Sequence, residues 1–260
     1  MSRIKNYLIN KGWSDDQLRA LHSVREFFFH INWLKTIWFN FKALPTRQAI
    51  KLPFIIGRNV KVGNVGKIIF QSRATIGMVS IAVIRINGME TNSYQTLFNN
   101  DGTFIFKGRA KFHPGAKISI FPNAVLTFGN RVSIGSLTKI VCSRQIILHD
   151  DIRMSWNGQM FDTDFHFLTN VNKNKVHPRQ KPVEIESEVF IGNSCTIGKG
   201  TYIPKGSVIS CCSKVSGNHK EDGENLLIVG NPGKVIAQGF KMGNSWFPEI
   251  EGEIAKNFGE

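Results

Sequence analysis

The residues best suited to chemistry lie in one short segment, Asp162-Thr-Asp-Phe-His166. Histidine is the natural general base for a hydroxyl group, because its imidazole gains and loses a proton in the physiological range. An extended backbone would place Asp162, Asp164 and His166 on one side of the chain, where a carboxylate can hold the ring in one tautomer. We therefore predict His166 as the catalytic base, Asp164 as the residue that orients it, and Asp162 as a substrate contact.

The elements that must position this segment follow a spacing of six residues. Aliphatic side chains recur without interruption at Ile185, Ile191, Ile197, Ile203, Ile209 and Val215. A helix would repeat apolar residues at three and four, and a half-buried strand at two, so neither explains the sixes. The spacing is typical of the hexapeptide repeat of a parallel β-helix, in which each unit supplies one short strand and one corner.

The same spacing extends toward the N-terminus and then breaks. It holds at Phe106, Phe112 and Ile118, slips before Phe128, and holds again at Phe128, Ile134, Ile140, Ile146 and Ile152. The next 33 residues, from Ile152 to Ile185, are not a multiple of six, which predicts an inserted loop at about 153–184. A solenoid carries such insertions on one face, and loops of this length are more often functional than idle. The break also contains the Asp162–His166 segment.

Two further segments resemble the hexapeptide-repeat acyltransferases with a left-handed β-helix. The run Ile185-Glu-Ser-Glu-Val-Phe-Ile-Gly-Asn-Ser-Cys-Thr-Ile-Gly-Lys-Gly200 is similar to the family's I-G-D-N-V-W-I-G run. Val229-Gly-Asn-Pro-Gly-Lys-Val-Ile236 is similar to its closing G-N-P-A-K segment. The resemblance implies a mainly β fold, with a left-handed parallel β-helix over residues 51–236. The handedness comes from the family, because left-handed coils are exceptions to the usual crossover rule.

The resemblance also implies an activity. Residues 162–166 are similar to the D-x-D-x-H segment of sugar O-acetyltransferases in this family, in which the histidine is the general base. The implied donor is acetyl-CoA, and the implied acceptor is a sugar hydroxyl of a surface polysaccharide, an oligosaccharide or its precursor. The family is usually a homotrimer, and each of its three sites is built from two chains.

The resemblance marks further residues around the donor. Phe190 lies 24 residues after His166, where the family has a tryptophan that lines the acyl-donor channel. Phenylalanine lacks the indole N–H, so a hydrogen bond to donor or substrate would have to come from elsewhere, for example from Trp156. The other expected coenzyme contacts are Gly192, Gly198, Lys199, Lys205, Lys214, Asn231 and Lys234.

The two ends of the chain differ from the repeat. Residues 1–50 have helical spacing, are rich in aromatic residues, and carry nine Lys or Arg with three Asp or Glu up to Lys51. This N-terminal extension is expected to cap the β-helix, to contact an anionic membrane, or to do both. Residues 237–260 are expected to form a surface-packed tail. The sequence contains no predicted signal peptide or membrane span, so we expect a cytoplasmic location, with the extension as the contact to the inner face of a membrane.

Other classes are disfavoured by specific residues. The net charge of +14 is accompanied by no nucleic-acid-binding motif, so we expect no nucleic-acid partner. The four cysteines, Cys142, Cys195, Cys211 and Cys212, lack metal-ligand spacing and are expected to be reduced. His113 and His149 fit the first interval of a γ-type carbonic anhydrase, but Met154 occupies the third ligand position, so no metal is expected.

Two alternatives to O-acetyl transfer remain open. One is N-acetylation of an amino sugar or a nucleotide-linked sugar, which would differ in the acceptor pocket. The other is a β-helical scaffold without catalytic activity that binds membrane or polymer, because fold alone does not establish function.

Overall fold

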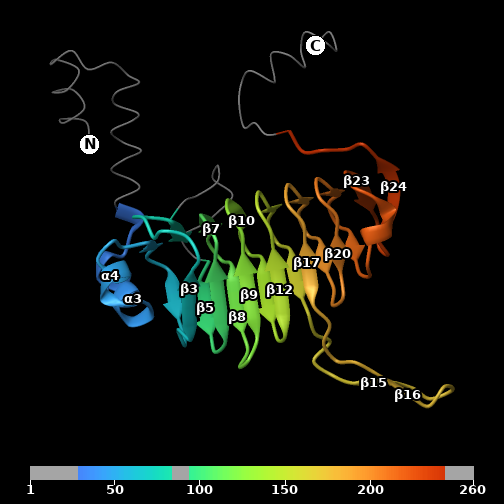
Figure 1. The fold of residues 1–260 in the computed structure, drawn as a ribbon, viewed down its shortest axis with the longest axis horizontal. Coiled ribbons are helices and arrows are strands. Elements are labelled where there is room, and N and C mark those ends of the chain that lie inside the picture. The colour runs from blue at the N-terminus through green and yellow to red at the C-terminus, as the bar shows by residue number, and fades with distance from the viewer. Residues whose placement is uncertain (1–28, 84–93, 244–260) are drawn as a thin grey trace, which may run out of the picture.

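A computed structural model of the chain describes residues 29–83 and 94–243. These residues form a three-sided coil of parallel strands, with two helices over its N-terminal end (Figure 1). No helix in these ranges is long and apolar enough to cross a membrane.

Each side of the coil is one sheet, and the chain passes from face 1 to face 2 to face 3 in turn. Face 1 has nine strands: β1 (Phe54–Ile56), β4 (Val79–Ile81), β7 (Ala110–Phe112), β10 (Val132–Ile134), β13 (Arg153–Met154), β18 (Phe190–Ile191), β21 (Val208–Ile209), β23 (Leu226–Val229) and β24 (Lys234–Gln238). Face 2 has seven: β2 (Val60–Val62), β5 (Thr96–Asn100), β8 (Lys117–Ile120), β11 (Lys139–Cys142), β14 (Gln159–Phe161), β19 (Thr196–Ile197) and β22 (Lys214–Val215). Face 3 has six: β3 (Lys67–Phe70), β6 (Thr103–Phe106), β9 (Val125–Phe128), β12 (Gln145–Leu148), β17 (Val183–Ile185) and β20 (Tyr202–Ile203). We call the corners between faces the 1/2, 2/3 and 3/1 edges.

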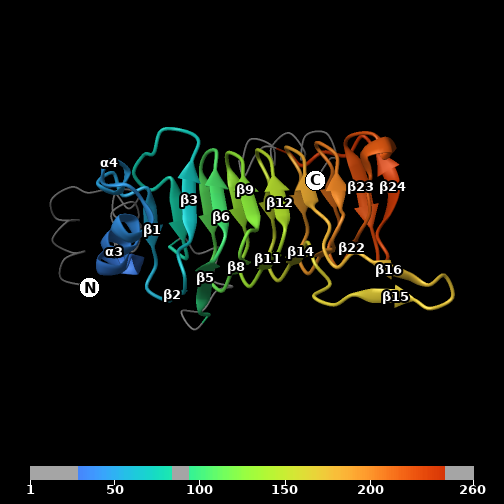
Figure 2. The same cartoon turned by 60° about the horizontal axis from the view of Figure 1, so that its bottom comes forward.

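The winding of the coil is left-handed. In Figure 2 the strands at the front, including β6, β9 and β12, run upward while the chain advances from left to right. Strand pairs within the faces are parallel, apart from β23 and β24, which pair in antiparallel fashion at the C-terminal end. The predicted left-handed parallel β-helix is therefore confirmed.

The repeat positions form the core. All six residues from Ile185 to Val215 that define the repeat have 0% exposure. The C-terminal coils are the narrowest, since Ile197 lies beside Val215, 18 residues later, whereas Ile118 lies beside Ile140, 22 residues later. The wider N-terminal coils contain four-residue strands and stacked phenylalanine rings, such as Phe104 and Phe106 with their centroids 4.1 Å apart. Larger side chains thus accompany longer coils.

Helix α3 (Trp33–Ala43) covers the first coil, followed by the short helix α4 (Thr46–Ala49). Phe39 is fully buried and its ring contacts that of Phe54, with 5.0 Å between centroids. Asn40 donates its side-chain amide to the Phe54 carbonyl oxygen and accepts from the Phe54 N–H, at 2.8 and 3.1 Å. The helix therefore satisfies backbone groups that the first strand would otherwise leave unpaired.

One long insertion leaves the coil at the 2/3 edge between β14 and β17. It contains the antiparallel hairpin of β15 (Leu168–Asn170) and β16 (Lys175–His177), which projects from the coil in Figure 1. We call residues 162–182 the arm. The arm is shorter than the loop predicted from the sequence, because β13 and β14 remain in the coil with Met154 and Met160 at inward positions. A further short helix, η1 (Lys220–Asp222), precedes β23.

Candidate active site at the base of the arm

Asp162 anchors the start of the arm. Its side chain is fully buried, and its carboxylate accepts hydrogen bonds from the backbone N–H groups of Ser143, Arg144 and Gln145 at 2.7, 2.6 and 2.7 Å. Those residues form the corner of the preceding coil. Because this carboxylate is occupied by backbone amides and removed from the surface, we assign Asp162 to the support of the site and no longer to substrate contact.

The buried thiol beside this carboxylate is not a nucleophile. The Sγ atom of Cys142 lies 3.8 Å from Oδ2 of Asp162. Burial, followed by the nearby Asp162 charge, raises the pKa of Cys142 far above the ordinary thiol value. Cys142 therefore stays protonated and contributes a small apolar side chain to the core.

The backbone after Asp162 turns instead of extending. Thr163 forms an antiparallel bridge with Gln180, Phe165 has a φ of 62°, and the Phe165 N–H donates to the Thr163 hydroxyl at 2.9 Å. The extended geometry predicted for residues 162–166 is therefore wrong. The turn directs Asp162 inward and leaves both Asp164 and His166 exposed on the arm.

Asp164 is held by a cation from the coil that follows the arm. Its carboxylate forms an ion pair with the ammonium of Lys199, which lies at the 2/3 edge between β19 and β20. The same ammonium donates to the carbonyl oxygen of Pro178 at 2.7 Å. The Asp164 N–H donates to the Arg179 carbonyl oxygen at 3.0 Å. Lys199 thus links both the outgoing and the returning segment of the arm's base to the coil.

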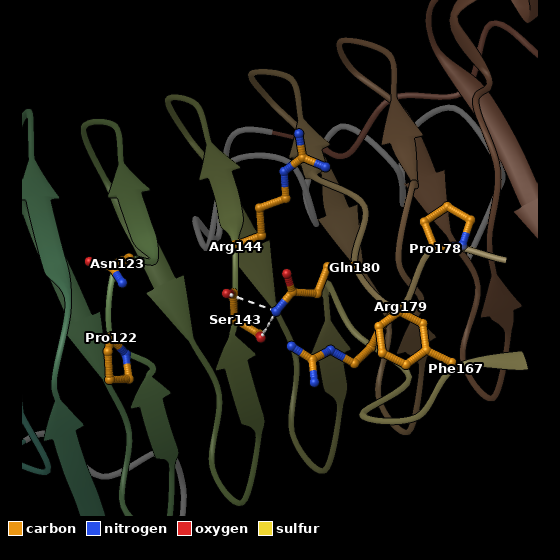
Figure 3. Close-up of a pocket in the computed structure, with 8 residues that line it drawn as sticks. All are labelled: Pro122, Asn123, Ser143, Arg144, Phe167, Pro178, Arg179 and Gln180. Atoms are coloured by element: carbon orange, nitrogen blue, oxygen red, sulfur yellow. Dashed lines mark hydrogen bonds between the residues drawn. The ribbon is translucent and has the colours of Figure 1, made fainter. Parts of the chain in front are cut away.

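A cleft of about 530 Å³ opens on the N-terminal side of this base. It lies along the 2/3 edge between the corners of two coils and the returning strand of the arm (Figure 3). The lining residues are Pro122, Asn123, Ser143, Arg144, Phe167, Pro178, Arg179 and Gln180. Gln180 closes one wall, since its side-chain nitrogen donates to the Ser143 hydroxyl and, at 3.2 Å, to the Ser143 carbonyl oxygen. Arg144, Arg179 and Gln180 were not predicted from the sequence.

The C-terminal side of the arm has a smooth edge. The 2/3 corners of the last coils contain Gly198 and Gly217, and a Cβ atom added at Gly217 would meet no heavy atom within 4 Å. Lys214 is exposed on the adjoining face 2. Glycine at these two positions leaves room for an extended, narrow ligand such as a pantetheine chain beside the exposed Ser216 and Asn218, and a cation nearby suits its phosphates.

The remaining predicted coenzyme residues lie elsewhere on the chain. Phe190 is on the outer side of face 1, between Arg153 and Val208 of the neighbouring strands. Trp156 is 46% exposed at the 1/2 edge, and Gly192 lies at the same edge, where a Cβ atom would come 2.7 Å from the Cys211 backbone nitrogen. The close approach explains Gly192 by packing alone.

The predicted lysines also differ in their surroundings. Lys205 lies at the 3/1 edge and pairs with Glu188 at 3.3 Å. Asn231 is exposed in the turn between β23 and β24, and Lys234 is exposed at the start of β24. In one chain, therefore, the structure brings Asp164, His166, Gly198 and Lys199 to the base of the arm. Lys214 lies beside the turn that contains Asn231 and precedes Lys234, since its N–H donates to the Gly230 carbonyl oxygen at 2.9 Å and its carbonyl oxygen accepts from the Gly233 N–H at 2.7 Å. Phe190, Trp156 and Lys205 lie at other parts of the coil.

His166 and Phe190 lie on opposite sides of the coil. In a three-sided coil the 2/3 edge lies opposite face 1, so the arm with His166 and the outer side of Phe190 point away from each other. A site that used both residues would have to combine two chains.

A second polar cluster lies on face 3. His149 Nε2 lies 2.9 Å from a Glu184 carboxylate oxygen and 4.0 Å from one of Glu186. The Tyr202 hydroxyl donates to Glu186 at 3.0 Å, and burial together with this bond raises the pKa of Tyr202 to about 12. His113 lies at the 1/2 edge and Met154 is 2% exposed in the core, so the three residues weighed for a carbonic anhydrase site do not share one surface within the chain.

No family model matches the sequence, and no curated protein matches it. Several solved structures have a similar backbone. The polySia specific acetyltransferase NeuO is 17% identical over 78% of this chain and 87% of that chain, with a TM-score of 0.49. The polysialic acid O-acetyltransferase OatWY is 16% identical over 77% and 96%, with a TM-score of 0.44. A variant of the N-acyltransferase AntD from Bacillus cereus, in complex with dTDP-4-amino-4,6-dideoxyglucose and Coenzyme A, is 15% identical over 79% and 88%, with a TM-score of 0.41. At these identities and scores the matches assign no activity to this chain, whose β-helix is established by its own strand pairing.

Proposed function

We propose that the protein is an acetyl-CoA-dependent O-acetyltransferase that acts on a sugar hydroxyl, with His166 as the general base. The observation that carries the proposal is the position of His166 on the exposed base of the arm, which separates a polar cleft from a smooth edge suited to the coenzyme. The motif resemblance around residues 162–166 and 185–200 supports the same activity.

The reaction needs one proton carrier and no covalent enzyme intermediate. His166 takes the proton of the acceptor hydroxyl as its oxygen attacks the thioester carbonyl carbon. When the carbon–sulfur bond breaks, the imidazolium returns that proton to the departing thiolate. Backbone N–H groups at the coil corners can stabilise the negative charge that develops on the carbonyl oxygen.

Asp164 and Lys199 contribute to the reaction by holding His166 in position. In this chain Asp164 pairs with Lys199, so its carboxylate steadies the turn that carries His166. A base held within a narrow range of positions loses less entropy at the transition state. We therefore propose Asp164 as a positioning residue rather than a proton carrier.

The donor site extends over two chains in this proposal. Gly198 and Lys214 would contact the coenzyme from the chain that supplies His166, and Phe190 would contact it from a neighbour. The homotrimer that the resemblance to the acyltransferase family implies would supply such a neighbour at each of its three sites.

The experiment is the release of coenzyme A from acetyl-CoA with a panel of neutral and acidic saccharide acceptors, including amino sugars. We expect wild type to transfer acetyl groups to hydroxyls, and His166→Ala to lose about 10²- to 10⁴-fold in rate while still binding the coenzyme. Equal turnover by both proteins would remove His166 from its role. Product with an N-acetyl group would favour the N-acetyltransferase, and failure of wild type to bind acetyl-CoA would favour the scaffold.

A further inference from the structure

We propose that the cleft at the base of the arm binds an acceptor sugar that carries a carboxylate, and that Arg144 and Arg179 recognise this group. The inference rests on the proposed function for its reaction, but the binding it describes can be measured without turnover.

The cleft contains cationic groups without matching anions. Its lining includes two arginines and no aspartate or glutamate. Within residues 29–83 and 94–243, neither guanidinium forms an ion pair with a carboxylate. Figure 3 shows the two guanidinium groups on either side of the Gln180 amide. An anion that enters the cleft would therefore gain a cationic partner on either side of Gln180.

The backbone that carries these arginines is fixed. The Arg144 N–H donates to buried Asp162 at 2.6 Å, and the Arg179 carbonyl oxygen accepts from the Asp164 N–H. The Arg179 guanidinium also lies over the Phe167 ring, 5.4 Å from its centroid. A guanidinium whose backbone and stem are already held loses less freedom when it binds a carboxylate through two hydrogen bonds.

The rest of the lining suits a sugar. Asn123, Ser143 and Gln180 offer amide and hydroxyl groups for hydrogen bonds to sugar hydroxyls, and Phe167 offers an apolar surface for the face of a ring. Recognition of such a sugar then needs few charged groups other than the two arginines. The net charge of +14 would also draw a polyanionic glycan to the protein and speed its encounter.

The cleft lies close to the proposed base along the chain. Phe167 lines it and directly follows His166. The smooth edge suited to the coenzyme is on the other side of the arm. An acceptor in the cleft and a donor along the C-terminal edge would therefore approach His166 from opposite sides.

The test is calorimetric titration of the full chain, in its native oligomeric state, with oligomers of a hexuronic acid and of an acidic 2-ketose. The same oligosaccharides with their carboxylates reduced to alcohols serve as matched probes. We expect at least one acidic probe to bind, and its reduced form to bind about 10- to 100-fold more weakly, as for a lost charged hydrogen-bonded pair. Failure of all acidic probes to bind, or equal binding of the reduced form, would overturn the proposal.

Substitutions locate the binding in the cleft. Arg144→Gln and Arg179→Gln should each weaken the acidic probe about tenfold or more, and the corresponding Lys variants should weaken it less, because lysine keeps the charge but loses the paired hydrogen bonds. Arg109→Gln is the control, since this exposed arginine lies at the 3/1 edge. If Arg144→Gln and Arg179→Gln weaken binding of the acidic probe no more than Arg109→Gln does, the proposal is contradicted.

Coenzyme binding separates this inference from the proposed function. Affinity for acetyl-CoA should be unchanged in the Arg144 and Arg179 variants, and a parallel loss would assign the arginines to the donor phosphates instead. If wild type binds the acidic probe but transfers no acetyl group, the acyltransferase proposal fails and the cleft assignment stands. If neutral saccharides are acetylated as well as acidic ones by all variants, the cleft assignment fails and the acyltransferase proposal stands.

Discussion

Lys199 forms an ion pair with Asp164 across the base of the arm, and so couples the coil after the insertion to the turn that carries His166. The sequence had suggested Lys199 as a contact for the coenzyme. Its two partners in the structure, the Asp164 carboxylate and the Pro178 carbonyl oxygen, both belong to the arm.

We therefore predict that Lys199→Ala loosens the arm and lowers kcat about 10- to 100-fold, as expected for a misplaced base. The KM for acetyl-CoA should change little, and steady-state kinetics with saturating acceptor measures both constants. Lys205→Ala is the control, because it removes an ammonium that pairs with Glu188 at another edge. A large rise in KM with kcat unchanged would return Lys199 to the coenzyme site.

Asp162 should contribute more to stability than an ordinary surface carboxylate. Asp162→Asn replaces an acceptor of three backbone N–H groups with a side chain that presents an NH₂ to at least one of them. We expect a loss of about 3 kcal/mol in the free energy of unfolding, measured by denaturant titration. Asp151→Asn breaks the exposed pair with Arg131 and should cost less than about 1 kcal/mol. Similar losses for the two variants would contradict the anchoring role of Asp162.

The outer side of helix α3 predicts contact with a membrane. Its exposed residues include Trp33, Leu34, Ile37, Trp38 and Phe41, and the basic residue Lys42 lies in its last turn. Aromatic and aliphatic residues beside cations are typical of helices that lie on anionic lipid.

We expect the protein to sediment with vesicles that contain anionic lipid, and Leu34→Glu, which changes a side chain that is 84% exposed, to reduce that binding at least about tenfold. Ile236→Glu is the matched control, since Ile236 is 61% exposed on β24 at the other end of the coil. Equal sedimentation of wild type and both variants would leave α3 with its capping role alone.

The sequence predicted the coil well because single aliphatic residues at a regular spacing mark its core positions. Ile185 and its successors at intervals of six are buried as expected. The bounds of the insertion were predicted less well, since Met154 and Met160 fill inward positions that the aliphatic pattern did not include. Methionine is unbranched and adapts to irregular space, so its presence marks a core position only weakly.

The site was harder to predict because it depends on contacts between distant segments. Nothing in the sequence pairs Asp162 with the Ser143–Gln145 corner or Arg144 with Arg179. The turn at Phe165 also has no glycine or asparagine to mark its positive φ, so an extended segment was the natural expectation. The motif located His166, but only the folded chain shows what lies beside it.

The opposite placement of His166 and Phe190 yields a test of the site between chains. His166→Ala and Phe190→Ala should each be weakly active alone, because every site in such a homotrimer lacks either the base or the aromatic wall. In trimers assembled from equal amounts of both variants, about one quarter of the interfaces combine an intact histidine from one chain with an intact phenylalanine from the next. We expect activity to rise toward about one quarter of the wild-type rate after mixing and reassembly.

Light scattering establishes that mixed oligomers have formed, and a mixture of His166→Ala with His166→Gln is the control, because no interface in it regains a base. If mixed trimers form without recovery, Phe190 does not share a site with the His166 of another chain. If the protein is monomeric and active, the two residues act separately and the donor must bind along the 2/3 edge alone.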